Sequence, residues 1–288
     1  TSSAVDPIEK KPLFHFLPGS YSYSVATSGC NLRCPWCQNH DLSQAPRRLI
    51  PPNACGAWTP PEKIVSMALK RKCSSMSFTY SEPTIFYEYA RDIGVLARSK
   101  GLKNGFVTNG MMTPEVIADA KAFLDAANVD LKGATKKFYA RFCKGSIDAV
   151  MESIGAMHEA GIWVEVTTLV IPGHNDSDRD LRFIAGFLAG VSPDLPWHIS
   201  RFHPDNEWLS LPPTPVSTLK RAAHIAREAG LNYVYIGNVR GEGFEDTRCP
   251  ECGNLQIKRC GFMADVKGVR EGRCSKCDAP VPGVWGGS

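Results

Sequence analysis

Short runs of β-prone residues, several of them nearly continuous in apolar side chains, alternate with stretches of helical spacing from Tyr21 onward. The predicted strands are Ser22–Ala26, Met76–Tyr80, Gly105–Thr108, Ala127–Leu131, Trp163–Ile171, His198–Phe202 and Tyr233–Ile236. Apolar runs of this length are typical of buried parallel strands. About six successive β–α units result, and with right-handed crossovers they predict an α/β fold, either a doubly wound sheet or a full or partial (β/α) barrel.

Helix start signals support this alternation. Thr59-Pro-Pro-Glu62 matches a capping box with a proline just inside the helix start. Thr113 opens another helix in a similar way, and further helices are predicted after Ser177 and after Pro215. Each signal stands where a β–α crossover requires its helix to begin.

Three regions are predicted along the 288 residues. Residues 1–20 contain prolines and little periodicity, so we expect an N-terminal arm that runs over the surface. Residues 21–243 hold the β–α units. A cysteine loop, not a glycine-rich phosphate loop, follows their first strand, which favours a barrel over a dinucleotide-binding sheet. Residues 244–288 hold four cysteines and little apolar bulk, so this tail is expected to need a metal in order to fold.

Composition narrows the class of protein without naming a partner. Hydrophobic residues make up 43% of the chain and charged residues 22%, a balance that allows a substantial core. The net charge of +4 includes basic clusters at Arg47-Arg48, Lys70–Lys72 and Lys136-Lys137, which are more often solvated faces than nucleic-acid contacts. No apolar run approaches the length that crosses a bilayer, so we expect no membrane partner. Eleven cysteines, most of them closely spaced, favour metal binding in a reducing, cytoplasmic compartment, although a leader removed before Thr1 is compatible with the sequence.

A cysteine loop directly after the first predicted strand carries the strongest chemical signal. Cys30, Cys34 and Cys37 have the spacing C-x3-C-x2-C. A [4Fe–4S] cluster normally takes four cysteine ligands, so three thiolates leave one iron open to an external chelator. S-adenosylmethionine (SAM) can fill that position with its amino and carboxylate groups, which makes the three cysteines candidate catalytic and metal-ligating residues. The alternative is a structural zinc site that lacks one ligand.

The loop resembles the signature of the radical SAM superfamily. Within it the chain resembles the pyruvate formate-lyase activating enzyme-like group, and specifically the radical SAM enzymes of the AmmeMemoRadiSam system. The segments that carry the resemblance are TYSEPTIFYEYA at 79–90, VTNG at 107–110, ANVDLK at 127–132, WVEVTT at 163–168, PWHISRFHP at 196–204 and CPEC at 249–252. The resemblance implies a radical SAM barrel, an external low-potential reductant, and Memo-family and AMMECR-type proteins as partners.

The resemblance also implies which residues bind SAM, most of them at the ends of predicted strands. They are Trp36, Glu82, Thr108, Asn109, Asp130, Lys132, Thr167 and His198. Glu82 matches the position that binds the SAM amino group, and His198, expected at the end of its strand, matches a histidine that contacts SAM. The residues from Thr108 to Thr167 match positions near the SAM carboxylate and ribose.

Four of these assignments are more specific or have an alternative interpretation. Asp130 matches an acid that helps to hold a monovalent cation. Trp36 is placed to stack near the adenine or, alternatively, to pack on the cysteine loop. Glu82 is alternatively an anion at a helix N-terminus, and Asn109 alternatively a turn residue. Further candidates for the substrate side are Cys143, Arg201 and His203.

The tail contains two further cysteine pairs. Cys249 and Cys252 are separated from Cys274 and Cys277 by 21 residues, just beyond the commonest zinc-ribbon spacing. Four thiolates fit tetrahedral Zn²⁺ or a rubredoxin-type iron, and the sequence does not separate the two metals. We expect a structural zinc-ribbon or rubredoxin-like module, whereas an electron-transfer role would require iron.

The function predicted from these features is reductive cleavage of SAM. The product would be a 5′-deoxyadenosyl radical that abstracts hydrogen from an unidentified protein or small-molecule substrate. One alternative is a radical SAM enzyme that modifies RNA, with the basic clusters binding phosphates. Another is a zinc-binding interaction module built on an inactive barrel.

Overall fold

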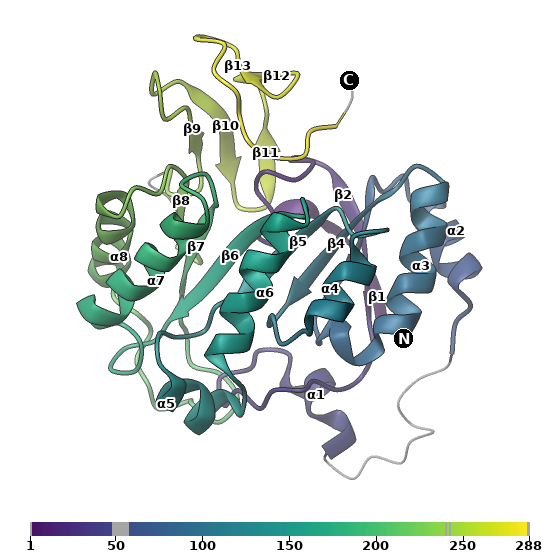
Figure 1. Cartoon of the computed structure of the whole chain (residues 1–288), viewed down its shortest axis with the longest axis horizontal. Helices are drawn as coiled ribbons and strands as arrows, with labels where there is room; N and C mark the ends of the chain where they lie inside the picture. The colour runs from purple at the N-terminus through teal and green to yellow at the C-terminus, as the bar shows by residue number, and fades with distance from the viewer. Residues whose placement is uncertain (1, 48–57, 240, 242, 287–288) are drawn as a thin grey trace.

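The computed structural model describes residues 2–47, 58–239, 241 and 243–286. An eight-stranded sheet forms the centre of this part of the chain (Figure 1). Its strands are β1 Ser2–Pro7, β2 Tyr21–Ala26, β3 Ser75–Phe78, β4 Lys103–Thr108, β5 Ala126–Asp130, β6 Trp163–Val170, β7 Trp197–Arg201 and β8 Val234–Gly237. They lie side by side in chain order, β1 antiparallel to β2 and the strands from β2 to β8 parallel. The seven predicted strands are confirmed, with ends that differ by at most two residues.

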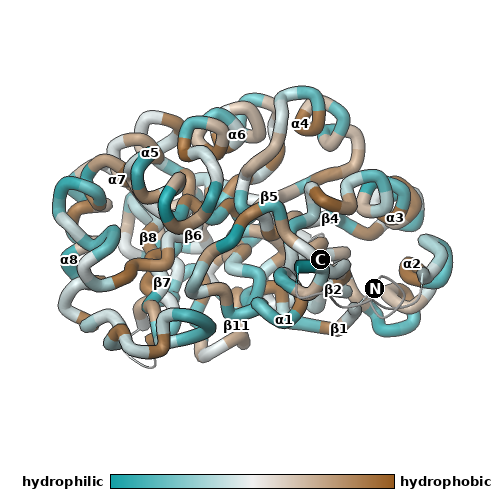
Figure 2. The backbone as a smooth tube through the Cα atoms, turned by 90° about the horizontal axis from the view of Figure 1, so that it is seen from below, coloured by the Kyte–Doolittle hydropathy of each residue, from teal (hydrophilic) through white to brown (hydrophobic). Residues whose placement is uncertain are grey.

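Helices cover the outer side of the parallel strands. They are α2 Pro61–Lys70, α3 Tyr87–Ser99, α4 Pro114–Ala120, α6 Ile147–Glu159, α7 Asp178–Val191 and α8 Val216–Glu228, whereas the short helices α1 His40–Ser43 and α5 Lys136–Phe138 lie at the carboxyl end of the strands. Figure 2 shows most of them in an arc around the strands. Because β1 and β8 are the two edges of the sheet, the fold is a partial barrel, one of the predicted architectures. None of the described helices is long and apolar enough to cross a membrane.

Helix capping explains where several of these helices begin. The Thr113 hydroxyl accepts a hydrogen bond from the backbone N–H of Val116 at the start of α4, and Ser177 caps α7, as predicted. The predicted capping box at Thr59 is wrong, because α2 begins after Pro60 and has no side-chain cap. Pro60 and the next residue, also a proline, carry no N–H, so fewer donors there need a partner.

The predicted N-terminal arm does not run over the surface. After β1 and the 3₁₀ turn η1 Ile8–Lys10, residues 11–17 enter the amino end of the barrel, and we call them the plug. Leu13 and Phe16 are completely buried there. Leu13 packs closely against β4 because residue 105 is a glycine. A Cβ atom added at Gly105 would lie 3.3 Å from Leu13 Cδ1. Leu13 and Phe16 form a buried apolar cluster with Ile8, Leu17 and Ala126 of β5.

The tail closes the same end from outside. Its strands are β9 Thr247–Arg248, β10 Leu255–Cys260, β11 Met263–Asp265, β12 Val269–Arg270 and β13 Arg273–Cys274. Leu17 N–H donates to Val284 O at 2.8 Å, and Val284 N–H donates to His15 O at 2.7 Å. Arg259 reaches through to donate to Phe14 O at 2.7 Å. We call this amino end the barrel floor and the opposite, carboxyl end the barrel mouth. The region boundaries near residues 20 and 243 stay a prediction.

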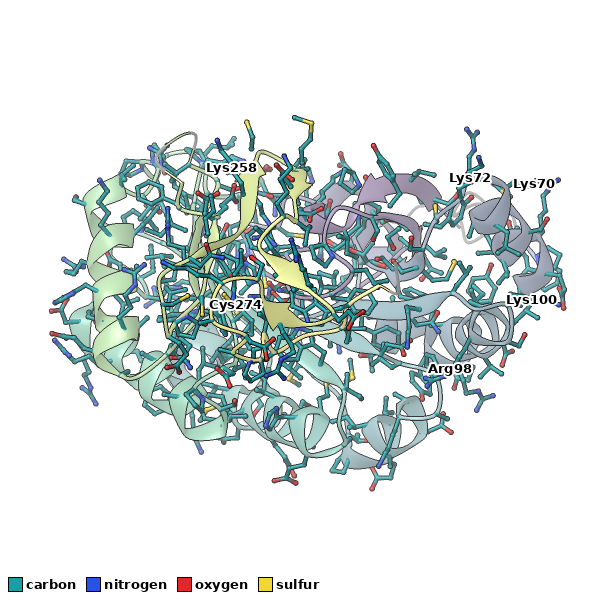
Figure 3. The ribbon with its side chains drawn as sticks, turned by 90° about the horizontal axis from the view of Figure 1, so that it is seen from above. Lys70, Lys72, Arg98, Lys100, Lys258 and Cys274 are labelled. Atoms are coloured by element: carbon teal, nitrogen blue, oxygen red, sulfur yellow. The ribbon has the colours of Figure 1, made fainter. Side chains whose placement is uncertain are left out.

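The longest basic cluster lies on the floor side. Figure 3 shows Lys70, Lys72, Arg98 and Lys100 together, to one side of Cys274 in the tail. These residues stand where α2 and α3 end and lead into the amino ends of β3 and β4. The cluster is therefore at the opposite end of the barrel from the cysteine loop that follows β2.

Candidate functional site

The cysteine loop leaves the carboxyl end of β2 and leads into α1 at the barrel mouth. Cys30, Cys34 and Cys37 are all partly buried there. Cys30 Sγ accepts a hydrogen bond from the backbone N–H of Leu32 at 3.4 Å, and Cys37 Sγ lies 3.3 Å from Ser43 Oγ in α1. Local contacts within the loop and α1 thus hold the thiols on the edge where a (β/α) barrel carries its reacting groups.

The surroundings of two of these thiols favour the protonated form. Burial raises the pKa of Cys30 to about 11. A hydrogen bond with Cys143, together with burial, raises the pKa of Cys34 well above its usual value, and nearby Lys132 acts against this rise. Thiolates in this environment need a positive charge beside them, which iron ions supply, and metal binding would release the protons. The loop therefore fits a metal cluster on electrostatic grounds.

The three thiols of the cysteine loop are separate from the four-cysteine group of the tail, whose ligand atoms all lie within 4.8 Å of one another. A [4Fe–4S] cubane binds each thiolate through a different iron, so three loop cysteines can hold three of its irons.

Glu82 is buried beside this loop. It precedes the 3₁₀ turn η4 Pro83–Phe86, and its Oε1 accepts hydrogen bonds from Thr84 N–H, Thr84 Oγ1 and Thr108 Oγ1 at 3.1, 2.6 and 2.7 Å. Oε2 accepts from Asn109 N–H at 2.7 Å. Glu82 therefore does cap a short helical turn, which was the alternative interpretation. Even so, burial raises its pKa, because these neutral donors do not fully compensate for lost water.

Asn109 connects Glu82 to the cysteine loop. Its backbone N–H binds Glu82, while its side-chain Nδ2 donates to Asn31 Oδ1 at 2.7 Å and contacts Cys30 Sγ at 3.7 Å. Its Oδ1 accepts from Met111 N–H at 3.0 Å, which is the turn contact foreseen as the alternative. Asn109 therefore makes the turn contact and also links the Glu82 carboxylate to Cys30, a predicted cluster ligand.

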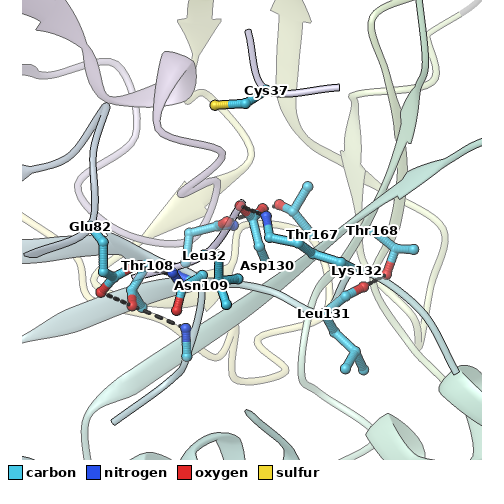
Figure 4. Close-up of polar contacts among 12 residues, drawn as sticks. Leu32, Cys37, Glu82, Thr108, Asn109, Asp130, Leu131, Lys132, Thr167 and Thr168 are labelled. Carbon is cyan, nitrogen blue, oxygen red and sulfur yellow. Dashed lines mark hydrogen bonds and ion pairs between the residues drawn. The ribbon is translucent and has the colours of Figure 1, made fainter. Parts of the chain in front are cut away.

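Asp130, Lys132 and Thr167 lie on the other side of the mouth (Figure 4). Asp130 ends β5 and pairs in register with Thr167 of β6, and its Oδ2 lies 2.8 Å from Lys132 Nζ. Burial alone would lower the pKa of Lys132, but Asp130 and Cys34 raise it well above its usual value. Thr167 Oγ1 donates to Asn128 Oδ1 at 2.9 Å, inside the barrel. Lys132 therefore already neutralises the Asp130 carboxylate. Binding of a monovalent cation by Asp130 stays a prediction.

Comparison with known proteins decides the family. A family model for the radical SAM superfamily matches residues 24–184. The uncharacterized protein MJ0808 from Methanocaldococcus jannaschii is 45% identical over 284 residues, which cover 97% of this chain and 83% of that protein. This chain belongs to the radical SAM superfamily.

Solved structures of low sequence identity share the radical SAM fold. A domain of pyruvate-formate lyase-activating enzyme from Bacteroides vulgatus is 19% identical, with a TM-score of 0.51, and covers 57% of this chain and 99% of its own. A radical SAM methyltransferase from Sphaerobacter thermophilus is 16% identical, with a TM-score of 0.60, and covers 78% of this chain and 68% of its own. These similarities confirm the predicted α/β barrel class.

His198 lies in a different place in this radical SAM barrel from the one expected. It is the second residue of β7, not its last, and its Nε2 lies 2.6 Å from Glu165 Oε2. It stacks on Tyr235 of β8, and Phe14 of the plug meets its edge. The expected position at the end of the strand is therefore wrong, because β7 continues for three residues beyond His198, to Arg201. Contact between His198 and SAM stays a prediction.

Trp36 is buried among other aromatic rings of the mouth. Its ring centroid lies 4.8 Å from that of Trp208 and 5.6 Å from that of Phe138. Both rings belong to other segments, those after β7 and β5, so these contacts are not packing on the cysteine loop. Stacking near adenine stays a prediction. Of the suggested substrate-side residues, Cys143 is completely buried, and His203 lies 3.1 Å from Gln38 beside the cysteine loop.

Two residues of the radical SAM site were not predicted from the sequence. Asn31 accepts the Asn109 hydrogen bond, and its position inside the cysteine motif was an unused signal. Arg47 was expected on a solvated basic face, but it donates to Cys30 O at 2.7 Å. Arg47 therefore helps to hold the cysteine loop. Its neighbour Arg48 lies outside the described residues.

The tail forms the predicted four-cysteine site. Cys249 Sγ lies 3.6 Å from Cys277 Sγ, and Cys252 Sγ lies 3.8 Å from Cys274 Sγ. Although burial opposes it, hydrogen bonds from following backbone N–H groups and neighbouring cysteines lower the pKa of Cys274 to about 6. Cys260 is exposed and does not belong to this group. Four converging thiols fit one tetrahedral ion, either zinc or iron.

Proposed function

We propose that this protein cleaves SAM reductively and acts by radical chemistry on a protein or small-molecule substrate. Cys30, Cys34 and Cys37 would hold a [4Fe–4S] cluster with one iron open to SAM. When bound, the reduced cluster and SAM supply methionine and a 5′-deoxyadenosyl radical, which takes a hydrogen atom from the substrate. An external low-potential, one-electron reductant is required.

The buried, incompletely neutralised carboxylate of Glu82 is the observation that carries this proposal. Oε2 accepts one hydrogen bond, so it has room for a further donor such as the SAM ammonium group. Asn109 fixes the distance between this carboxylate and Cys30. Asn109 would thereby join amino-group binding and cluster binding in one unit, as chelation of SAM to the open iron requires.

Other residues of the mouth would orient SAM and protect the radical. Lys132 is a partly buried cation that affects Cys34 electrostatically, and it would favour the thiolate needed for iron binding. The aromatic rings around Trp36 would limit the access of water to one side of the loop. We assign Thr108, Asp130 and Thr167 to the surroundings of the SAM carboxylate and ribose on the resemblance described above.

The test is production of 5′-deoxyadenosine. The full chain is reconstituted anaerobically with iron and sulfide, and 5′-deoxyadenosine is quantified after addition of SAM and dithionite. Cys34→Ala should lower production to the level without protein, whereas Cys260→Ala, which removes an exposed thiol outside both groups, should leave it unchanged. Undiminished production by Cys34→Ala would refute the proposed cluster site.

The finer assignment to the AmmeMemoRadiSam system remains part of the proposal. It suggests Memo-family and AMMECR-type proteins as partners and a cytoplasmic location, and the resemblance to glycyl-radical activators allows a protein glycine as target. Co-purification of the tagged chain with such proteins from a native host would support the partner assignment. Absence of any such protein at stoichiometric level would contradict it.

We infer that the tail metal has a structural role. The tail holds the plug at the barrel floor, far along the fold from the cysteine loop, and contains few apolar residues. Elemental analysis of the unreconstituted protein should find about one zinc or iron per chain that Cys274→Ser removes and Cys260→Ser retains. Retention of that metal by Cys274→Ser would place it elsewhere.

A further inference from the structure

A pocket of about 570 Å³ opens beside the barrel mouth, and none of its lining residues is among those assigned above to the cluster or to SAM. Three successive β–α connections line it, those that follow β5, β6 and β7. The lining residues are Thr135, Lys137, Phe138, Arg141, Phe142, Gly173, His174, Trp208, Ser210 and Leu211. Its volume is that of a small-molecule site.

Aromatic rings form one wall of this pocket and continue to the cysteine loop. Phe142 meets Trp208 edge to face, with centroids 5.2 Å apart, and His174 stacks on Trp208 at 4.5 Å. Trp208 in turn lies 4.8 Å from Trp36, which stands between two cluster ligands. A ligand in this pocket would therefore sit next to the radical-generating loop and contact a wall of π faces and edges.

Two cations form the rim. Lys137 and Arg141 are exposed, and no salt bridge to either is present among the described residues. The Arg141 guanidinium lies over the Phe142 ring, 5.1 Å from its centroid, so charge and aromatic surface are adjacent. None of the lining residues is acidic. The neighbouring Lys136, by contrast, pairs with Asp148 at 2.7 Å and is not part of the lining.

We propose that this pocket binds a nucleoside phosphate as the substrate-recognition site of the reaction, with the base on the aromatic wall and the phosphate between Lys137 and Arg141. This inference rests on the proposed function. Bases stack on aromatic side chains, and exposed cations bind phosphate. A peptide would need an extended groove or a sheet edge, whereas loops and short helical turns of three connections line this pocket. SAM is a poor occupant because it carries no phosphate. The nucleotide comes either as a free mononucleotide or as a residue of single-stranded RNA.

The test measures binding to the reconstituted, SAM-loaded protein. Calorimetry is carried out with AMP, CMP, GMP and UMP separately, with the parent nucleosides, with inorganic phosphate and with an octanucleotide RNA. We expect at least one mononucleotide or the RNA to bind, and Lys137→Gln or Arg141→Gln to weaken it about tenfold or more. Lys136→Gln is the matched control and should change nothing. Phe142→Leu should weaken nucleotide binding more than phosphate binding.

The outcomes distinguish a free nucleotide from RNA, and they distinguish failure of the pocket assignment from failure of the proposed function. RNA binding without mononucleotide binding, with the same dependence on Lys137, assigns the nucleotide to nucleic acid, whereas mononucleotide binding assigns it to a free metabolite. The inference is overturned if no nucleotide or RNA binds, if Lys137→Gln has no effect, if hexaglutamate binds instead, or if Lys137→Gln weakens SAM binding equally. Loss of 5′-deoxyadenosine production in Cys34→Ala would then still stand, so failure of the pocket assignment is distinct from failure of the proposed function.

Discussion

The mouth and the floor of the barrel each contain one buried glutamate with four hydrogen-bond donors, yet the two carboxylates differ in charge balance. At the mouth, Glu82 accepts only from backbone amides and threonine hydroxyls. At the floor, Glu165 accepts from Phe14 N–H and His15 N–H in the plug, from an indole, and from His198 at 2.6 Å. Within the part of the chain that the structure describes, no cationic side chain binds Glu82, whereas Glu165 has a histidine beside it.

This difference appears in the directions of the two pKa shifts. Burial raises the pKa of Glu82, and its neutral donors do not reverse that rise. Burial would raise the pKa of Glu165 as well, but the hydrogen bond and charge of His198 lower it below the usual value. A buried carboxylate without a cation is a candidate binding site for a cationic ligand, whereas one that is already paired serves structure. The comparison assigns ligand binding to the mouth and stability to the floor.

The largest predicted effect is on the floor. Glu165→Gln removes the charge opposite His198 and places an amide NH₂ among donors, so we expect a loss of about 3–5 kcal/mol in the free energy of unfolding. Urea denaturation followed by circular dichroism measures this loss. Glu159→Gln, at an exposed position at the end of α6, is the matched control and should change stability by less than about 0.5 kcal/mol. Equal stability of both variants would show that the charge of Glu165 does not stabilise the barrel floor.

The next effect concerns the pH dependence of the floor. His15 is completely buried, with Nδ1 donating to Pro282 O and Nε2 accepting from the Tyr235 hydroxyl, each at 2.7 Å. Burial lowers the pKa of His15 to about 4. Between pH 6.5 and 4 the unfolded chain binds a proton at His15 that the folded chain does not, so stability falls as the pH falls. The expected loss is about 3 kcal/mol across that window.

Unfolding free energies measured at intervals from pH 7 to pH 4 test this prediction. His15→Phe should be less stable at neutral pH, because two hydrogen bonds are lost, but its stability should fall less steeply toward pH 4. His158→Gln, at an exposed position in α6, should keep the slope of the unsubstituted protein. A His15→Phe variant with an unchanged slope would show that another group controls acid sensitivity.

The mouth should respond in binding more than in stability. Glu82→Gln removes the charge that the SAM ammonium would meet, and loss of a charge-assisted hydrogen bond should weaken SAM binding about 10- to 100-fold. Because burial already disfavours the charged form of Glu82, its loss should cost less unfolding free energy than Glu165→Gln. Calorimetry of the cluster-loaded protein measures the first quantity and urea denaturation the second. Exposed Glu88→Gln serves as the control, and a larger stability loss for Glu82→Gln than for Glu165→Gln would invert the comparison.

The sequence predicts the mouth far better than the floor, for a physical reason. Apolar runs identify the parallel strands, and the carboxyl ends of these strands converge, so the strand pattern places Glu82 and Asn109 at the mouth. Their assignment to SAM came from the family resemblance. The floor depends on contacts between distant segments. Arg259 meets Phe14 across 245 residues, and the plug has no period because its side chains fill an irregular volume. Glu165 was overlooked although an acid within an apolar strand was a visible signal.

The smallest predicted effect tests whether residues of the mouth depend on the helices that follow them. Thr113 caps α4 four residues after Asn109, and Thr113→Ala should cost about 1 kcal/mol of unfolding free energy. SAM binding should be unaffected, because Asn109 is held by Glu82 and Asn31 and not by the helix. Thr113→Ser retains the capping hydroxyl and should restore stability. A fall in SAM affinity in Thr113→Ala that Thr113→Ser reverses would mean that α4, and not the Glu82 contact, positions Asn109.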